Sequence, residues 1–310
     1  MTIGVAVIGA GMAGRGHAAA YRAATSLYGS DLPEVKLVSI GDVNAQFGEA
    51  AAKRFGFERH DADWRTIADD PNIHAVSVVV ANSLHREIVE GLLASGKHVL
   101  CEKPLSDTLE DARSMVSAAK ASDKVASIGL TFLRNPAIAA IQKIIASGQL
   151  GKVLHFTGNY WADYSCDPMS PISWRYKGGM GTGALADVGS HISYVAEFIT
   201  GQTFKSVSGA RFVTSITERP VPSGAVQGHS GATVSDKMDT VENDDYAGFI
   251  ADFGGVAGAI EVSRVAAGHP TSLEFEVYCE KGAARFTQSR NGEFELLLNE
   301  DPYGQRGFRT

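Results

Sequence analysis

The chain has 310 residues, of which 44% are hydrophobic, and a formal net charge of -7. This length and composition allow a large buried core, and the length favours two domains. The negative charge and the lack of a long basic run argue against nucleic acid as a partner. The longest apolar runs, 75–81 and 138–146, are far shorter than the roughly 20 residues that cross a bilayer, so we expect no membrane span.

The beginning of the chain and its cysteines bear on location and redox state. A strand pattern starts at Ile3 with no signal-peptide pattern before it, and we expect a cytoplasmic protein. The three cysteines (Cys101, Cys166 and Cys279) lack the paired spacing of a zinc site, so we predict reduced, structural thiols and no metal.

Short apolar runs rich in Val and Ile alternate with helical stretches up to about residue 130. The predicted strands are Val5–Ile8, Val35–Ile40, Ala75–Val80, His98–Cys101 and Val125–Leu130. Continuous apolar strands separated by helices are typical of a parallel sheet covered on both faces. We therefore predict a Rossmann domain with a doubly wound parallel sheet over residues 1–130, within an overall α/β fold class.

The rhythm changes over residues 131–310, which we predict to form an α/β domain for substrate binding and oligomerisation. A helix over Pro136–Ser147 precedes seven long strand-like runs, several of which alternate apolar and polar residues. This pattern predicts a large open, mostly antiparallel sheet, whose spare face favours a homodimer or homotetramer. The stretch Pro220–Asp239, rich in Gly, Ser, Thr and Pro, predicts a long mobile loop.

A glycine-rich turn follows the first predicted strand and opens a helix. It contains the predicted cofactor contacts Gly9, Gly11, Met12 and Ala13 and ends at Gly14. Such glycines allow a tight turn and close approach to a pyrophosphate, which the positive end of the following helix attracts. A glycine-rich turn that only joins strand to helix is the alternative.

Polar residues follow the next two predicted strands. Asp42 comes after the second strand, where a carboxylate accepts hydrogen bonds from the adenosine ribose and repels a 2'-phosphate, which predicts NAD rather than NADP. A solvated loop aspartate is the alternative. Asn82 and His85 follow the third strand, at the sheet edge where ligands collect, and are predicted to line the cofactor. In the alternative, Asn82 or Ser83 only caps the following helix.

Lys103 follows the strand His98–Cys101 and is expected at the same edge of the sheet. A lysine there can donate to a substrate oxygen and stabilise developing negative charge, although a lone lysine is more often solvated. Asp187 and His191 stand four residues apart, which on a helix places them on one face. His191 can then accept a hydroxyl proton while Asp187 orients its ring; a surface pair is the alternative.

These motifs together resemble the glucose-fructose oxidoreductase, inositol dehydrogenase and MocA (Gfo/Idh/MocA) family. The resemblance rests on the glycine-rich turn, on the run Gly96–Leu105 around Lys103, and on Asp187–His191. It implies a Rossmann domain followed by an α/β domain with an open sheet. It also implies that Lys103, Asp187 and His191 are catalytic and that Glu102 lies beside the nicotinamide ribose.

The segment Asp163–Arg175 is similar to levoglucosan dehydrogenase-like members of that family, which oxidise a secondary hydroxyl of an anhydrosugar with NAD. Stacking and hydrogen bonding to a sugar or polyol are predicted for Trp161, Asp163, Asp167, Trp174 and Arg175. A rigid aromatic loop is the alternative. Members of this group continue past the equivalent of Thr310, so we expect a C-terminal segment to be missing.

The sequence therefore predicts an NAD-dependent dehydrogenase of a sugar, anhydrosugar or cyclic polyol. In this hypothesis His191 removes the hydroxyl proton, Lys103 polarises the oxygen, and Asp187 orients both. One alternative is an NADH-linked keto-sugar reductase or an enzyme that recycles NAD internally. A second is a noncatalytic NAD-binding regulator, which the presence of all three residues disfavours.

Overall fold

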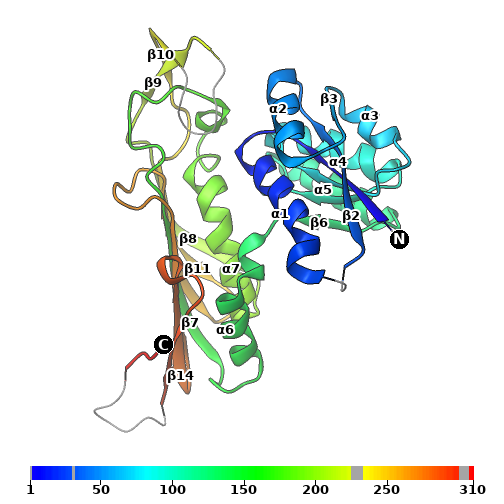
Figure 1. Ribbon diagram of the computed structural model, residues 1–310. Helices are drawn as coiled ribbons and strands as arrows, with labels where there is room; N and C mark the ends of the chain where they lie inside the picture. Colours follow the sequence, from blue (N-terminus) through cyan, green and yellow to red (C-terminus); the bar gives the residue numbers. More distant parts are fainter. Residues whose placement is uncertain (1, 30–31, 225–232, 300–306) are drawn as a thin grey trace. The chain divides into compact units, whose positions relative to one another are not determined.

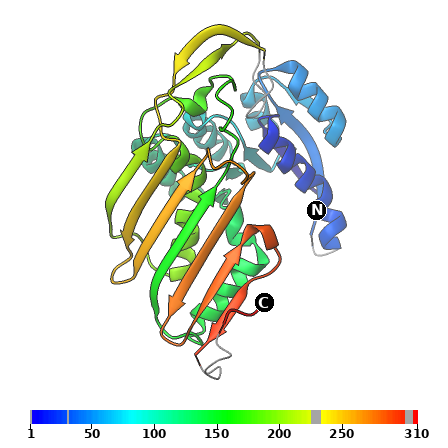
Figure 2. The same cartoon turned by 90° about the vertical axis from the view of Figure 1, so that its left-hand side faces the viewer.

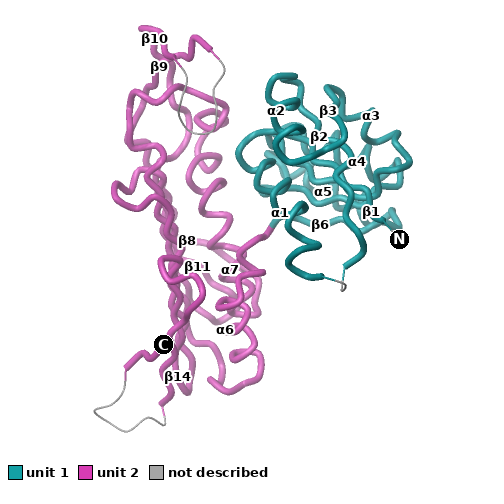
Figure 3. Tube along the Cα trace, in the orientation of Figure 1, with its two compact units in different colours: residues 1–129 teal, residues 130–310 magenta. Residues whose placement is uncertain are grey.

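The computed structural model of the chain describes residues 2–29, 32–224, 233–299 and 307–310. The chain forms two compact units, Met1–Gly129 and Leu130–Thr310 (Figure 3). In the described ranges, no helix combines the length and the apolar character needed to cross a membrane.

Within the described residues, the first unit is built on a six-stranded parallel sheet with the order β3-β2-β1-β4-β5-β6 (Figure 1). The strands are β1 (Thr2–Ile8), β2 (Glu34–Gly41), β3 (Arg59–Asp61), β4 (Ala75–Val78), β5 (His98–Cys101) and β6 (Ala126–Ile128). The prediction of a doubly wound parallel sheet is confirmed. The strand order reverses between β1 and β4, and in such sheets a dinucleotide binds at the carboxyl ends of the strands beside this point.

Helices cover both faces of this sheet. They are α1 (Met12–Tyr28), α2 (Ala45–Phe55), α3 (Trp64–Asp69), α4 (His85–Ala94) and α5 (Leu109–Ala121). Successive strand residues point to opposite faces. Accordingly, Val7 of β1 packs in a buried cluster with Ala18 of α1, while its neighbour Ile8 packs in another with Leu92 of α4. The inner strands β1 and β4 are largely apolar because both of their faces are buried.

The N-termini of α4, α5 and the following helix α6 differ in how they are capped. Thr108 accepts a hydrogen bond from the Asp111 N–H of α5 at 3.1 Å. Asn135 caps α6 (Pro136–Ala146) by accepting from Ala137 N–H at 2.9 Å. A 3₁₀ turn, Asn82–Leu84, precedes α4 and puts Leu84 at its N-cap. Neither Asn82 nor Ser83 therefore occupies the N-cap position, and the alternative that one of them only caps α4 is wrong.

In the part of the second unit that is described, the main sheet has seven strands in the order β15-β14-β13-β7-β12-β11-β8 (Figure 2). They are β7 (Val153–Trp161), β8 (Ser206–Val213), β11 (Tyr246–Asp252), β12 (Ala257–Ser263), β13 (Ser272–Cys279), β14 (Gly282–Thr287) and β15 (Glu295–Leu298). All neighbours are antiparallel except β7 and β12, which run parallel. The sheet is open and mostly antiparallel, as predicted.

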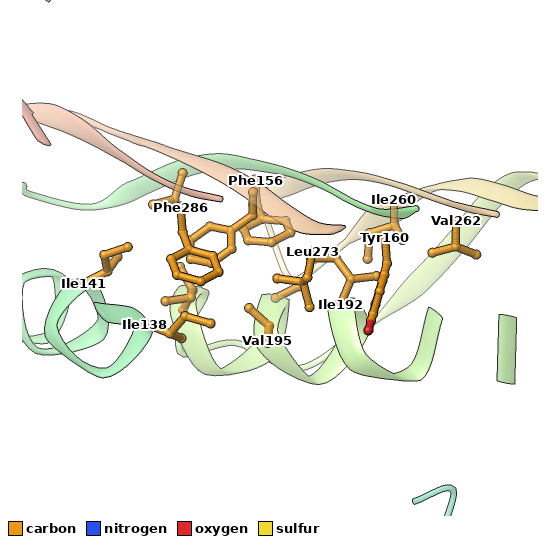
Figure 4. Packing of buried hydrophobic residues seen from close by; sticks show 14 of the residues in the cluster. Ile138, Ile141, Phe156, Tyr160, Ile192, Val195, Ile260, Val262, Leu273 and Phe286 are labelled. Carbon is orange, nitrogen blue, oxygen red and sulfur yellow. The ribbon is translucent and has the colours of Figure 1, made fainter. Parts of the chain in front are cut away.

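Helices α6 and α7 (Ser190–Thr200) pack on one face of this sheet (Figure 4). Phe156 and Leu273 point from the strands toward Ile192 and Val195 of α7, and all four are buried. The opposite face is polar and forms a pocket of about 380 Å³ whose lining includes Thr157, Asn159, Glu274, Glu276 and Arg285. The alternation in the sequence thus separates a helix-covered face from a polar one.

The stretch predicted as a long mobile loop contains two paired strands. They are β9 (Glu218–Pro222) and β10 (Val234–Thr240), which pair antiparallel. Both ends of the stretch are therefore strands and not a mobile loop, which corrects the prediction there. Residues 225–232 lie outside the described residues. Pro220 and Pro222 lie at the start of the stretch, and composition alone could not separate this hairpin from a loop.

Candidate active site

The glycine-rich turn after β1 has little steric freedom at two positions. Gly9 has a φ of +108°, and a Cβ added there would lie 2.0 Å from the Val79 carbonyl oxygen. A Cβ on Gly14 would lie 1.8 Å from the Gly9 oxygen. Only glycine therefore allows the turn to close and α1 to pack on it.

Gly11 is different because an added Cβ there meets nothing within 4 Å. It is the N-cap of α1 and makes no side-chain capping hydrogen bond. The neighbouring Met12 and Ala13 are exposed. An uncapped N-terminus of a 17-residue helix beside open space fits a pyrophosphate, which accepts backbone N–H bonds and is attracted by the helix dipole.

Asp42 follows β2 and ties the glycine-rich turn to the next loop. One carboxylate oxygen accepts from Ala10 N–H and the other from Asn44 N–H, both at 2.8 Å. It is therefore a fixed carboxylate, not a solvated loop residue. Each oxygen keeps a second lone pair, so the group fits ribose hydroxyls as the prediction requires.

His85, a predicted cofactor contact, is fully buried. Its Nδ1 lies 3.0 Å from the Pro104 carbonyl oxygen and its Nε2 lies 3.2 Å from the Val80 carbonyl oxygen. The ring therefore links the end of β4 to the lysine turn (residues 102–105). This placement supports a role in holding the turn. A contact of His85 or of Asn82 with the cofactor stays a prediction.

The lysine turn follows β5, and its Lys103–Pro104 peptide bond is cis. Glu102 accepts from Lys103 N–H at 3.1 Å, and its other oxygen lies 3.0 Å from Nε2 of His17 on α1. Burial alone would raise the pKa of Glu102, but these hydrogen bonds and the charges of His17 and Lys103 together lower the pKa. Glu102 is thus an ionised carboxylate whose two oxygens are both held.

In the second unit, Asp187 lies in a π-helical turn, Leu185–Gly189, directly before α7. The prediction that Asp187 and His191 share a face assumed a regular α-helix through both residues. Instead, a π-helical turn contains Asp187 and the α-helix begins at Ser190. The turn is held by Asp244, which is fully buried and accepts from three backbone N–H groups: Gly181 at 2.7 Å, Gly183 at 3.2 Å and Leu185 at 2.8 Å. Single π turns occur frequently at functional sites.

A tyrosine that the sequence did not indicate holds the Asp187 carboxylate. The Tyr164 hydroxyl donates to Asp187 Oδ2 at 2.6 Å. Burial, followed by the negative charge of Asp187, raises the pKa of Tyr164 well above its ordinary value, so its hydroxyl keeps its proton at neutral pH. Tyr164 therefore stays a hydrogen-bond donor and fixes the position of Asp187.

His191 is surrounded by aromatic residues. Its Nδ1 lies 2.8 Å from the hydroxyl of Tyr194, which accepts from Phe132 N–H at 3.2 Å. The Phe132 and Tyr160 rings lie 5.2 and 5.7 Å from the imidazole ring, centroid to centroid. Nδ1 of His191 is thus held by a hydroxyl group. Tyr194 stands three residues after His191, a helical spacing from which it was predictable.

The predicted substrate residues are spread over the loop after β7. Trp174 is exposed, and the Arg175 guanidinium lies 4.4 Å from its ring centroid. Asp163 is half-buried and Asp167 is exposed. Trp161 is the last residue of β7, and since its neighbour Tyr160 faces His191, strand alternation directs Trp161 to the opposite face. A sugar contact stays a prediction for each.

Two buried arginines, Arg219 and Arg264, contact the loop after β7. The guanidinium groups of Arg219 and Arg264 lie 4.3 and 4.7 Å from the Tyr176 ring centroid. Arg219 donates to the Asp167 carbonyl oxygen at 2.7 Å and to the Ser165 carbonyl oxygen at 2.6 Å.

Arg264 makes an ion pair with Asp245 at 2.8 Å and donates to the Arg175 carbonyl oxygen at 3.1 Å. Asn243, to which the sequence assigned no function, donates to the same Arg175 oxygen at 2.9 Å. These contacts fix the backbone of the loop around Tyr176.

Comparison with known proteins identifies the class to which this fold and site belong. Residues 3–130 match the oxidoreductase family with an NAD-binding Rossmann fold, and residues 138–285 match the GFO/IDH/MocA C-terminal domain. The first unit is therefore an NAD-binding domain, and the protein is an oxidoreductase. It belongs to the Gfo/Idh/MocA family, as the sequence motifs indicated.

Individual relatives extend this assignment. The chain is 35% identical to levoglucosan dehydrogenase of Pseudarthrobacter phenanthrenivorans, over 99% of this chain and 79% of the relative. It is 29% identical to scyllo-inositol 2-dehydrogenase (NAD(+)) of Bacillus subtilis, over 58% of this chain and 51% of the relative. A solved structure of levoglucosan dehydrogenase with NADH and L-sorbose superposes with a TM-score of 0.91 at 33% identity, covering 100% of this chain and 79% of that one.

Proposed function

We propose that the protein is an NAD-dependent dehydrogenase that oxidises a secondary hydroxyl of a sugar, an anhydrosugar or a cyclic polyol. The observation that carries this proposal is the pair Asp187 and His191, each hydrogen-bonded to a tyrosine hydroxyl at the start of α7. An aspartate and a histidine held in this way are suited to general acid-base catalysis. In this chain they follow an NAD-binding domain. The relatives named above act on substrates of these classes.

The chemistry follows from the charge and proton state of each group. Bound NAD supplies the hydride acceptor. His191 takes the hydroxyl proton at Nε2 while Tyr194 holds Nδ1. Lys103 donates to the substrate oxygen and stabilises its developing negative charge. Asp187, fixed by Tyr164, orients both. The second unit supplies Asp163, Trp174 and Arg175 of the loop after β7 for the substrate, and the first unit supplies Gly9, Gly11, Met12, Ala13, Asp42 and Glu102 for NAD.

The decisive experiment is a screen of NAD reduction at 340 nm against inositols, aldoses, anhydrosugars and sugar acids. Replacing Lys103 or His191 by Ala should lower turnover at least about a hundredfold, the scale of general acid-base catalysis. The matched controls are Lys120→Ala and His269→Ala, which remove an exposed lysine and an exposed histidine. Near-normal turnover in both active-site variants would refute the mechanism.

The same screen separates the alternatives. An NADH-linked keto-sugar reductase would oxidise NADH instead, and an enzyme that recycles its cofactor would give no net absorbance change while keeping NAD through gel filtration. A noncatalytic regulator would bind NAD and turn over nothing. For the cofactor, Asp42 should give a higher kcat/KM with NAD than with NADP. Equal or better efficiency with NADP would contradict that assignment.

Assembly and location are further parts of the proposal. The face of the seven-stranded sheet that α6 and α7 leave uncovered supports a homodimer or homotetramer built on this face. Light scattering at micromolar concentration tests it, and a monomer would contradict it. We also propose a cytoplasmic location, which fractionation of cells that express the protein would test.

A further inference from the structure

A chain of hydrogen bonds runs through the first unit to the lysine turn, and of its side chains only Glu102 has a part in the function proposed above. The Tyr21 hydroxyl lies 2.9 Å from Ser77 Oγ, which lies 3.0 Å from His17 Nδ1. His17 Nε2 lies 3.0 Å from Glu102, whose second oxygen accepts from Lys103 N–H. Ser77 is fully buried, and the side chains of His17 and Glu102 are only 16% and 18% exposed.

The ionised Glu102 sets the direction of the bonds in this chain when His17 is neutral. An ionised Glu102 only accepts, so His17 must donate from Nε2. In a neutral imidazole Nδ1 then accepts, so Ser77 donates to it and Tyr21 donates to Ser77. With His17 neutral, all the protons point toward Glu102. Bonds aligned in this way polarise one another and favour a negative charge at the end of the chain.

Glu102 lies at the edge of the sheet where a dinucleotide binds. It follows β5, and in a doubly wound sheet the ligand lies at the carboxyl ends of the strands, one half of it on each half of the sheet. The glycine-rich turn after β1 and Asp42 after β2 fit the pyrophosphate and the adenosine ribose. The half formed by β4, β5 and β6 is then left for the nicotinamide, which is positively charged in NAD⁺ and neutral in NADH.

We propose that His17 is a positioning residue that, through Glu102, makes the cofactor site favour NAD⁺ over NADH. The fixed carboxylate attracts the positively charged ring and gains nothing from the neutral one. The inference rests on NAD binding at the sheet edge, which is part of the proposed function, and not on the sugar. An enzyme that oxidises its substrate would thereby bind the oxidised cofactor and release the reduced one.

The test measures binding of each nucleotide without any sugar. The dissociation constant of NADH is measured by fluorescence and that of NAD⁺ by calorimetry. Glu102→Gln, which removes the charge but keeps the shape, should lower the ratio Kd(NADH)/Kd(NAD⁺) about fivefold, the scale of one partly screened charge pair. His17→Leu should lower it similarly. His17→Gln, which keeps a donor toward Glu102, should retain most of the preference.

Three controls make the result decisive. Glu110→Gln removes an exposed charge of α5 and should leave the ratio unchanged. The double variant with Glu102→Gln and His17→Leu should fall no further than either single one, because both act through one charge. Circular dichroism and the melting temperature show whether each variant is folded, and His17→Ala, which also lacks a donor toward Glu102, carries the test if His17→Leu is not.

The inference is overturned if both dissociation constants weaken together and their ratio stays within twofold of the wild type. It is also overturned if Glu102→Gln lowers the ratio and a folded His17→Leu does not, since His17 then positions nothing. Binding of neither nucleotide by the wild type would overturn it together with the NAD site. A protein that shows the predicted ratios and oxidises no sugar would refute the substrate proposal alone.

Discussion

Replacing Asp244 by Asn should destabilise the second unit and lower turnover. The carboxylate accepts from three backbone N–H groups at 2.7, 3.2 and 2.8 Å and is fully buried. In Asn the carbonyl oxygen can keep the bonds to Gly181 and Gly183. The amide group would then face the Leu185 N–H, so two donors would meet. The hydrogen bond from Leu185 N–H to the charged group would be lost and this part-buried N–H would be left without its acceptor, at a cost of about 2–4 kcal/mol.

The assay is urea unfolding followed by tryptophan fluorescence. Of the three tryptophans of the chain, only Trp64 lies in the first unit, so a Trp64→Phe background makes the signal report the second unit. The matched control is Asp252→Asn, whose oxygen accepts from Gly254 and Gly255 N–H in an exposed turn. It should change the stability by about 0.5 kcal/mol at most. A loss below about 0.5 kcal/mol in Asp244→Asn would refute the reasoning.

Three further predictions concern the first unit and the cysteines. Gly14→Ala should abolish NAD binding, measured by calorimetry, because its Cβ would lie 1.8 Å from the Gly9 oxygen; Gly16→Ala, where nothing lies within 4 Å, is the control that should bind normally. Glu102→Gln should lower the free energy of unfolding most at neutral pH. The lowered pKa of Glu102 makes its contribution full at neutral pH and lost as the pH falls below about 4.3, so a pH-independent difference in urea unfolding would contradict this. A thiol reagent at pH 8 should label Cys166 first. Burial raises the pKa of Cys101 to about 12 and that of Cys279 to about 11, and rapid labelling of all three in the folded protein would argue against it.

The first unit was predictable because its signals are local. Its inner strands β1 and β4 are largely apolar on both faces, and the glycines and Asp42 stand directly after strands, so their place at one sheet edge follows from the parallel topology. The second unit was predictable only in outline. Alternation indicated strands, but no local signal distinguishes the parallel pairing of β7 with β12 from the antiparallel pairs around it. The β9–β10 hairpin has the composition of a loop.

The same contrast holds in the candidate site. Lys103, Asp187 and His191 are identifiable from motifs, and Tyr194 was within reach because it is three residues from His191. The partners that hold the other groups are not. His17 bonds to Glu102 across 85 positions, and Tyr164 to Asp187 across 23. Such pairs arise from tertiary packing, and a single sequence gives no sign of them.

The ring of Tyr176, which two buried arginines contact, constrains how this lineage can change. Loss of the ring would leave two cations in the interior without the surface that covers them, and loss of Arg264 alone would leave Asp245 as an unbalanced buried charge. Single replacements at 176, 219 or 264 should therefore be selected against, although the three positions are far apart in the chain. Among related sequences these positions should vary as a set, and a change in all three would mark a branch in which the loop after β7 follows another path.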